Sequence, residues 1–182
     1  ADILLTSTRG GNDFKRTFLE AFIRPGRDPR NWTSRANYAA HGMHVTAPDE
    51  LSLFVQHNCG YPTSHVRRYV IRLDGFVSIN APFTGGEMLT RPLTFTGDRM
   101  TINYASSAAG GMHVEIQDPT GRPIGGFAMA DCDEIIGDQI DRVVTWKGSA
   151  DLSSLAGEPI RVRFVLRDAD LYSLQFISNA GK

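Results

Sequence analysis

Short stretches of alternating apolar and polar residues, separated by Gly- and Pro-containing turns, dominate the second half of this sequence. In the segment 161–167, Val162 and Phe164 face one way and Arg161 and Arg163 face the other, because successive strand side chains point to opposite faces of a sheet. Helical periodicity is scarce, and short strands with explicit turns and no intervening helices are typical of an all-β domain. We therefore expect an antiparallel β-sandwich, jelly-roll-like, with an N-terminal β-rich extension.

The strand pattern differs between the two halves of the chain. In the second half the expected strands are 88–95, 100–104, 112–117, 142–146, 160–166 and 171–177, with turns at 96–98, 109–111 and 118–121. In the first half they are 3–7, 51–56, 66–73 and 76–79, together with 17–23, for which a helix is the alternative. The glycine pair at 85–86 divides the sequence into a β-rich segment, 1–84, and a sandwich domain, 85–182.

Composition argues against several classes of partner. The 182 residues include 19 Lys/Arg and 20 Asp/Glu, a net charge of −1, so no general attraction to nucleic acid or to an anionic membrane is implied. The charge is uneven, with ten basic and seven acidic residues in 1–84 and nine and thirteen in 85–182. No apolar run is long enough to cross a bilayer. The first residue is Ala rather than Met, which suits a fragment of a longer protein.

The two cysteines, Cys59 and Cys132, are too few for a disulfide scaffold. Two unpaired thiols are the favoured interpretation, and a single bridge between the halves is the alternative.

A long irregular segment, from Arg16 to Tyr38, has the strongest claim to chemistry. It mixes guanidinium groups, carboxylates, amides and aromatic rings, which suits sugars, because rings stack on C–H faces while polar groups bind hydroxyls. The polar loop from His57 to His65 is a second patch of this kind. The predicted ligand-binding residues are Arg24, Asp28, Asn31, Trp32, Arg35, Tyr38, His57 and Tyr61. Trp32 is expected to be exposed and Trp146, in a strand, to be buried.

Glu20 is the candidate catalytic acid. It stands between Phe18 and Phe22, and burial there would raise the carboxyl pKa, as a general acid requires. The alternative is an ion pair between Glu20 and Arg16 or Arg24.

No cofactor and no metal site are predicted. His41 and His44 lack an acidic partner nearby in sequence. The acidic cluster from Asp131 to Glu134 could hold a structural Ca²⁺ ion, although a solvated acidic loop is the favoured interpretation.

Three phrases, at 16–32, 67–78 and 86–95, resemble the C-terminal region of bacterial proteins like the glycoside hydrolases of families 32 and 43. In those proteins a β-propeller is followed by a β-sandwich. The resemblance implies that 1–84 holds the last propeller strands and the junction, that the protein is secreted or periplasmic, and that a propeller is missing. It carries over Glu20 alone as a candidate acid, and one carboxylate cannot run the two-carboxylate glycosidase mechanism.

These features predict a carbohydrate-binding or accessory β-sandwich module whose partner is a glycan. One alternative is a small glycoside hydrolase with Glu20 as acid and Asp28 as its partner. The other is a structural β-domain that pairs with a propeller or with a second copy of itself.

Overall fold

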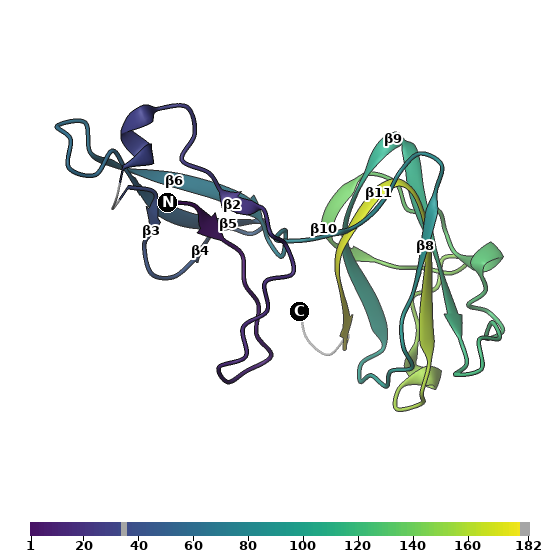
Figure 1. Ribbon diagram of the computed structural model, residues 1–182. Helices are drawn as coiled ribbons and strands as arrows, with labels where there is room; N and C mark the ends of the chain where they lie inside the picture. The colour runs from purple at the N-terminus through teal and green to yellow at the C-terminus, as the bar shows by residue number, and fades with distance from the viewer. Residues whose placement is uncertain (34–35, 179–182) are drawn as a thin grey trace. The chain divides into compact units, whose positions relative to one another are not determined.

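The computed structural model describes residues 1–33 and 36–178, and its regular secondary structure is almost entirely antiparallel strand (Figure 1). The all-β class is therefore confirmed. The chain divides into two compact units, Ala1–Leu73 and Asp74–Lys182. No helix within the described ranges is long and apolar enough to cross a membrane.

The first unit is built around one central strand, β5 (Glu50–His57). Strand β6 (His65–Arg72) pairs with β5 along its whole length, while β4 (His44–Ala47) and β3 (Tyr38–Ala39) pair with opposite ends of its other edge. A separate two-stranded sheet joins β1 (Ile3–Leu4) to β2 (Ala21–Ile23). The strand interpretation of 17–23 thus holds for its last three residues, and the helical alternative is wrong.

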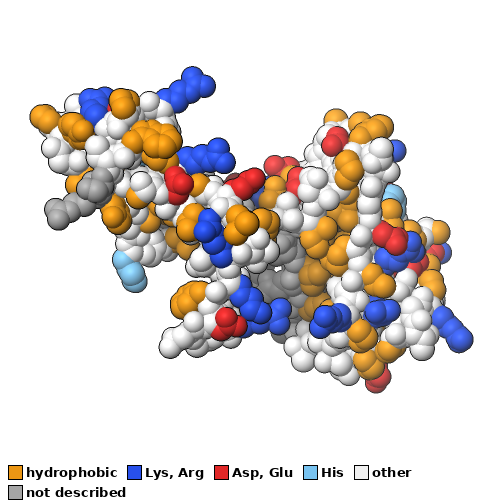
Figure 2. Space-filling model, in the orientation of Figure 1, with side chains coloured by type: hydrophobic (Ala, Val, Ile, Leu, Met, Phe, Trp, Pro, Cys, Tyr) orange, Lys and Arg blue, Asp and Glu red, His pale blue; other side chains and the backbone are white. Residues whose placement is uncertain are grey.

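The core of the first unit is small. Its buried cluster consists of Ile23, Leu53 and Val55, with Ile3, Phe22, Tyr69 and Ile71 packed partly buried against it. Several apolar side chains of this unit lie at the surface instead, among them Leu19, Val45 and Val66, each more than 60% exposed. Figure 2 shows such hydrophobic side chains on the visible face of the unit.

The second unit is organised by two long bent strands, β9 (Arg99–Gln117) and β11 (Arg161–Ile177), which pair along their length. Strand β10 (Asp138–Val143) adds to β9, while β7 (Ile79–Ala81) and β8 (Gly86–Leu89) add to β11. The sheet curls round its own core (Figure 1). Because β7 pairs with β11, this unit begins earlier in the chain than residue 85.

One predicted turn, and one expected break between strands, are absent because strands run through them. The turn expected at 109–111 lies inside β9, and the interval between the strands expected at 160–166 and 171–177 lies inside β11. The bend is made instead by irregular pairing near Asp168, which has φ of 44°. Gly110 lies against this point, and a Cβ atom there would collide with the carbonyl oxygens of Arg167 and Asp168. The glycine therefore serves a close backbone approach rather than a turn.

The core of the second unit follows the predicted alternation. Buried apolar residues recur at every second position over stretches of the long strands, as in Val162, Phe164 and Leu166 of β11. Trp146 is 2% exposed and donates its indole N–H to the Val114 carbonyl at 2.8 Å, which confirms the prediction that it is a core residue. Two 3₁₀ turns, η2 (Met129–Asp131) and η3 (Ser153–Leu155), complete the unit.

Both cysteines are free thiols, as the favoured interpretation held. Cys132 is buried in the second unit and its sulfur accepts a hydrogen bond from the Val114 amide. Burial raises the pKa of this thiol to about 11, so it stays protonated at neutral pH.

Candidate functional site

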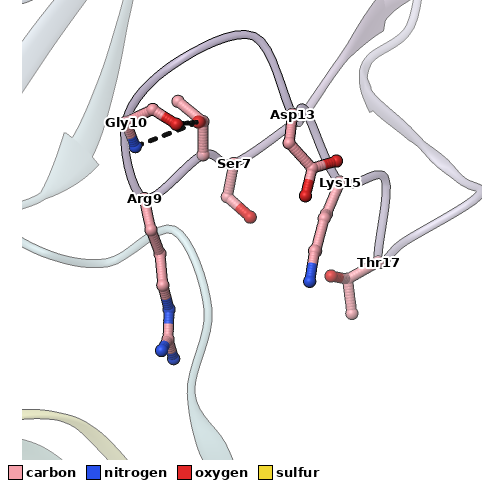
Figure 3. A pocket seen from close by; sticks show the side chains of 7 residues that line it. Ser7, Arg9, Gly10, Asp13, Lys15 and Thr17 are labelled. Carbon is pink, nitrogen blue, oxygen red and sulfur yellow. Dashed lines mark hydrogen bonds between the residues drawn. The ribbon is translucent and has the colours of Figure 1, made fainter.

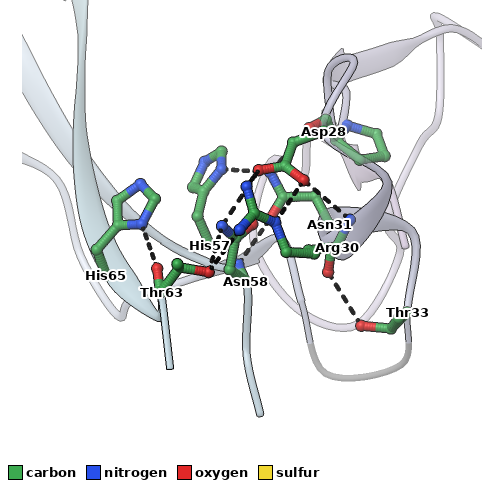
Figure 4. A network of polar contacts seen from close by, with 9 residues as sticks. Asp28, Arg30, Asn31, Thr33, His57, Asn58, Thr63 and His65 are labelled. Carbon is green, nitrogen blue, oxygen red and sulfur yellow. Dashed lines mark hydrogen bonds and ion pairs between the residues drawn. The ribbon is translucent and has the colours of Figure 1, made fainter. Parts of the chain in front are cut away.

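A connected polar network in the first unit ties together two segments that are about thirty residues apart in sequence (Figure 4). The first is the 3₁₀ turn η1 (Pro29–Trp32), which begins after Asp28. Proline suits the first turn of a helix, and an aspartate before it accepts a backbone amide; here the Asp28 carboxylate accepts the Arg30 N–H at 3.1 Å. The second is the loop from Asn58 to Thr63 between β5 and β6.

Asp28 and Arg30 form a two-point ion pair on the outer side of this network. The Arg30 Nε and Nη2 atoms lie 2.9 and 2.8 Å from the two carboxylate oxygens, which is the forked geometry that suits this pair. Arg30 also donates to the Thr63 hydroxyl, and the Asn58 amide donates to Asp28. Hydrogen bonds from Arg30 hold the pKa of Asp28 well below its usual range, so Asp28 remains ionised.

On the inner side, Asn31 links the two segments. Its Oδ1 accepts the backbone N–H of Asn58 at 2.7 Å, and its Nδ2 donates to the Pro25 carbonyl and meets the His57 Nδ1 at 2.6 Å. The other ring nitrogen of His57 contacts the Tyr69 hydroxyl at 3.0 Å. The amide of Asn31 is 3% exposed, as is the ring of His57.

This geometry keeps His57 neutral. Burial, and then the nearby Arg67 and His65, lower the pKa of the imidazole. Both ring nitrogens are occupied and the ring stacks on His65 and Tyr69, with centroids 5.4 and 5.9 Å away. The structure therefore places His57 beneath the surface, where it supports the loop and cannot reach a ligand directly.

Two aromatic rings stand on the segments that the network joins. Trp32 is 67% exposed, yet its indole N–H donates to the Gly26 carbonyl at 3.0 Å. Tyr61 is 40% exposed and is held in a tight turn by the hydrogen bond from its backbone N–H to the Asn58 carbonyl. The predicted exposure of Trp32 is confirmed.

Asn58 carries two signs of strain at the base of its loop. Its backbone has φ of 52°, a conformation that residues other than glycine adopt at a cost. Its side-chain Oδ1 is buried with no hydrogen-bond partner in the described part of the chain. Such unsatisfied acceptors are rare in native proteins and require a reason.

The structure therefore brings together Asp28, Asn31, Trp32, His57 and Tyr61 of the predicted set. Tyr38 lies on β3, 55% exposed and opposite Gln56 of β5, and Arg24 is exposed just after β2. Arg35 lies outside the described residues.

Burial between two phenylalanines, the condition on which Glu20 was a candidate acid, is not met. Glu20 is exposed and so is Phe18, because residues 16–20 belong to no strand. The apolar surroundings that a general acid would need are absent at this position.

Arg30, Asn58 and Thr63 lie in the two segments singled out from the sequence but were not among the predicted ligand-binding residues, and Tyr69 lies outside both segments. The Asp28-Pro29 pair was a usable signal, because it marks a capped turn whose third residue, Arg30, can fold back onto the cap. Nothing in the spacing of Asn58 or Tyr69 indicates that they meet this turn.

Among the residues described, no group of three or more His, Cys, Asp or Glu side chains could hold a metal ion. The carboxylates considered for Ca²⁺ are bound by the protein itself. Asp131 pairs with Lys147 at 2.5 Å, and Asp133 accepts hydrogen bonds from the Thr145 hydroxyl and the Gly148 amide.

No protein-family model, curated protein or solved structure matches this chain.

Proposed function

We propose that this chain is a non-catalytic carbohydrate-binding module, in which the first unit contacts the glycan and the second serves as scaffold. The observation that carries the proposal is Trp32. Two thirds of this side chain is exposed, while its indole N–H is tied to the Gly26 carbonyl. A large ring that is exposed and held in place offers a flat apolar surface to the C–H face of a sugar.

The polar groups beside the ring suit the hydroxyls of the same sugar. Arg30 is two residues from Trp32, its side chain is 44% exposed, and that of Asp28 is 32% exposed. The pair thus offers both donors and acceptors at the surface. Because Asn31, Asn58 and Thr63 fix these groups before a ligand arrives, binding orders few side chains, which favours affinity.

The carboxylates support binding rather than hydrolysis. A glycosidase of the usual kind needs one protonated and one ionised carboxyl group flanking the bond. Asp28 is held ionised by Arg30, and Glu20 has no apolar surroundings. The resemblance to families 32 and 43 leads us to propose further that the module accompanies a propeller in a secreted or periplasmic bacterial protein.

Replacement of Trp32 tests the proposal. The wild-type chain should be retarded by at least one polysaccharide in affinity electrophoresis against a panel of neutral and acidic polymers. Trp32→Ala should weaken that binding by about 30-fold, because truncating a central aromatic contact costs about 2 kcal/mol. Phe83→Ala, which removes a ring 61% exposed in the second unit, is the matched control and should bind normally. Absence of retardation across the panel, or full binding by Trp32→Ala, would refute the proposal.

A further inference from the structure

A surface hollow of about 580 Å³ lies in the N-terminal hairpin of the first unit, between β1 and β2 (Figure 3). Two cationic side chains, Arg9 and Lys15, line it together with the hydroxyl groups of Ser7, Thr8 and Thr17. Asp13 is the one carboxylate in this lining. The hollow therefore combines an excess positive charge with several hydrogen-bond donors.

The hairpin holds its two arms together by backbone bonds. Ser7 and Lys15 exchange N–H to carbonyl hydrogen bonds of 2.9 and 2.7 Å. At the tip, the Thr8 hydroxyl is bonded to the Gly10 backbone, and Gly10 and Gly11 supply positive φ values. Figure 3 shows the side chains of Arg9 and Lys15 extending from opposite arms in the same direction. Both cations therefore project to the same side of the hairpin.

Within the described ranges, no ion pair neutralises the charge of Arg9 or Lys15. Residues 1–73 carry ten Lys/Arg and six Asp/Glu, a net charge of +4, and two of the six acids, Asp28 and Glu50, already pair with Arg30 and Arg68. Figure 2 shows basic side chains along the hairpin. An anion would meet a favourable field here.

A second surface hollow lacks the excess positive charge of the hairpin hollow. It lies in the second unit, measures about 660 Å³, and is lined by Asp98, Arg99 and Asp151 among others. Its single cation, Arg99, stands 3.7 Å from the Asp98 carboxylate. The second hollow therefore has no excess positive charge to offer.

We propose that the hairpin hollow binds an oxyanion carried by a glycan, either the carboxylate of a uronic acid or a sulfate ester. The inference rests on the proposed carbohydrate-binding function and names its ligand class as acidic polysaccharides. The Arg9 guanidinium offers a fork that matches two oxygens of such a group, and Lys15 adds a point charge. The Ser7 and Thr17 hydroxyls provide further donors to the bound group.

Binding to polygalacturonate, dextran sulfate and neutral dextran, measured on the full chain at low salt, tests this inference. The first two polymers separate the carboxylate from the sulfate source. The double variant Arg9→Gln/Lys15→Gln should bind the preferred acidic polymer about tenfold more weakly. The reason is that hydrogen bonds between charged groups contribute more to affinity than hydrogen bonds between neutral groups. Its remaining binding should depend less on salt, because screening acts on the charges that were removed.

Two further variants separate a site from a general charge effect. Arg91→Gln/Arg122→Gln removes the same charge from exposed positions of the second unit and should bind as wild type. Arg9→Lys/Lys15→Arg keeps both charges and should retain binding. All the exchanged side chains are exposed, and circular dichroism confirms that the variants remain folded.

The outcomes distinguish the two proposals. If Trp32-dependent binding is found but the Arg9→Gln/Lys15→Gln variant binds acidic polymers like wild type, the hairpin site is refuted and the binding function stands. Equal losses in the hairpin variant and in the second-unit control refute the site as well. Absence of binding to any polysaccharide refutes both.

Discussion

A backbone amide decides which nitrogen of His57 carries the ring proton. The Asn58 N–H can only donate, so the Asn31 atom that receives it is the carbonyl oxygen, and the Asn31 amide nitrogen must face His57 Nδ1. That ring nitrogen therefore accepts, and the proton sits on Nε2, directed at the Tyr69 hydroxyl. Protonation of Nδ1 would set two donors against each other at 2.6 Å.

We expect the first unit to lose stability as the pH falls below about 6.5, the ordinary pKa of histidine. The folded-state pKa of His57 is lowered, so between the two values the unfolded chain binds more protons, and stability decreases with decreasing pH. The loss ends once the pH passes below the folded-state pKa. Urea unfolding at several pH values between 7.5 and 5 measures this loss of stability.

The matched variants for this test are His57→Gln and His41→Gln. The first removes the titrating group and should flatten the dependence of the unfolding midpoint on pH. The second removes an exposed histidine and should leave the dependence unchanged. A wild-type midpoint that stays constant over this range would contradict the assignment of a neutral, buried His57.

Residue by residue, much of the site could be chosen from sequence, but its connections could not. Asp28, Asn31, Trp32, His57 and Tyr61 stood out because their side chains suit sugar recognition. His57 supports the site from below through its contact with Asn31, which lies 26 positions away in the sequence. A contact over that distance leaves no local pattern in the sequence. The burial that a catalytic Glu20 would require is not found, because flanking aromatic residues indicate a core only where a sheet covers them.

At the scale of elements, the bend of the second unit depends on one glycine. Strands β9 and β11 pass each other most closely where Gly110 meets the carbonyl groups of Arg167 and Asp168. The sequence pattern indicated a turn at this point because the local signal, small residues ending in Gly110-Gly111, is the same for a turn and for a close approach. Only pairing with a strand more than fifty residues later distinguishes them.

Gly110→Ala should lower the free energy of unfolding by about 3 kcal/mol, the upper part of the range for overpacking a well-packed site. Both neighbouring atoms belong to the backbone of β11 and cannot turn aside. Gly125→Ala is the control, because nothing lies within 4 Å of an added Cβ atom there. Chemical denaturation of the two variants makes the comparison, and equal stabilities would show that the strands adjust to the extra methyl group.

For the molecule as a whole, the buried apolar residues are divided very unequally. The cluster in the second unit contains 20 buried residues and that in the first unit three. Since burial of apolar surface is the main source of stability, and small domains bury a smaller share of their surface, the two units must differ in stability.

The fragment 74–182 should therefore fold alone and unfold in one cooperative transition. The fragment 1–73 should unfold at a lower urea concentration and should bind a hydrophobic dye such as ANS, because its core is small and several apolar side chains are exposed. Circular dichroism during a urea titration compares the unfolding of the two fragments. A first unit as resistant to urea as the second would contradict this division.

The all-β class was predictable because alternation and turns are local properties of the sequence. The division of the core was not, because it depends on which strands cover one another.

The pairing of β11 also bears on how the second unit folds. This strand, the last one described, is the shared neighbour of β7, β8 and β9. Among the described strands, β7 and β8 have no other partner and β9 pairs otherwise only with β10, so most of the sheet cannot form until residues 161–177 exist. Such long-range pairing slows folding, because the intervening chain must be closed into a loop first. During synthesis, the apolar faces of the earlier strands would therefore remain exposed until the final strand leaves the ribosome.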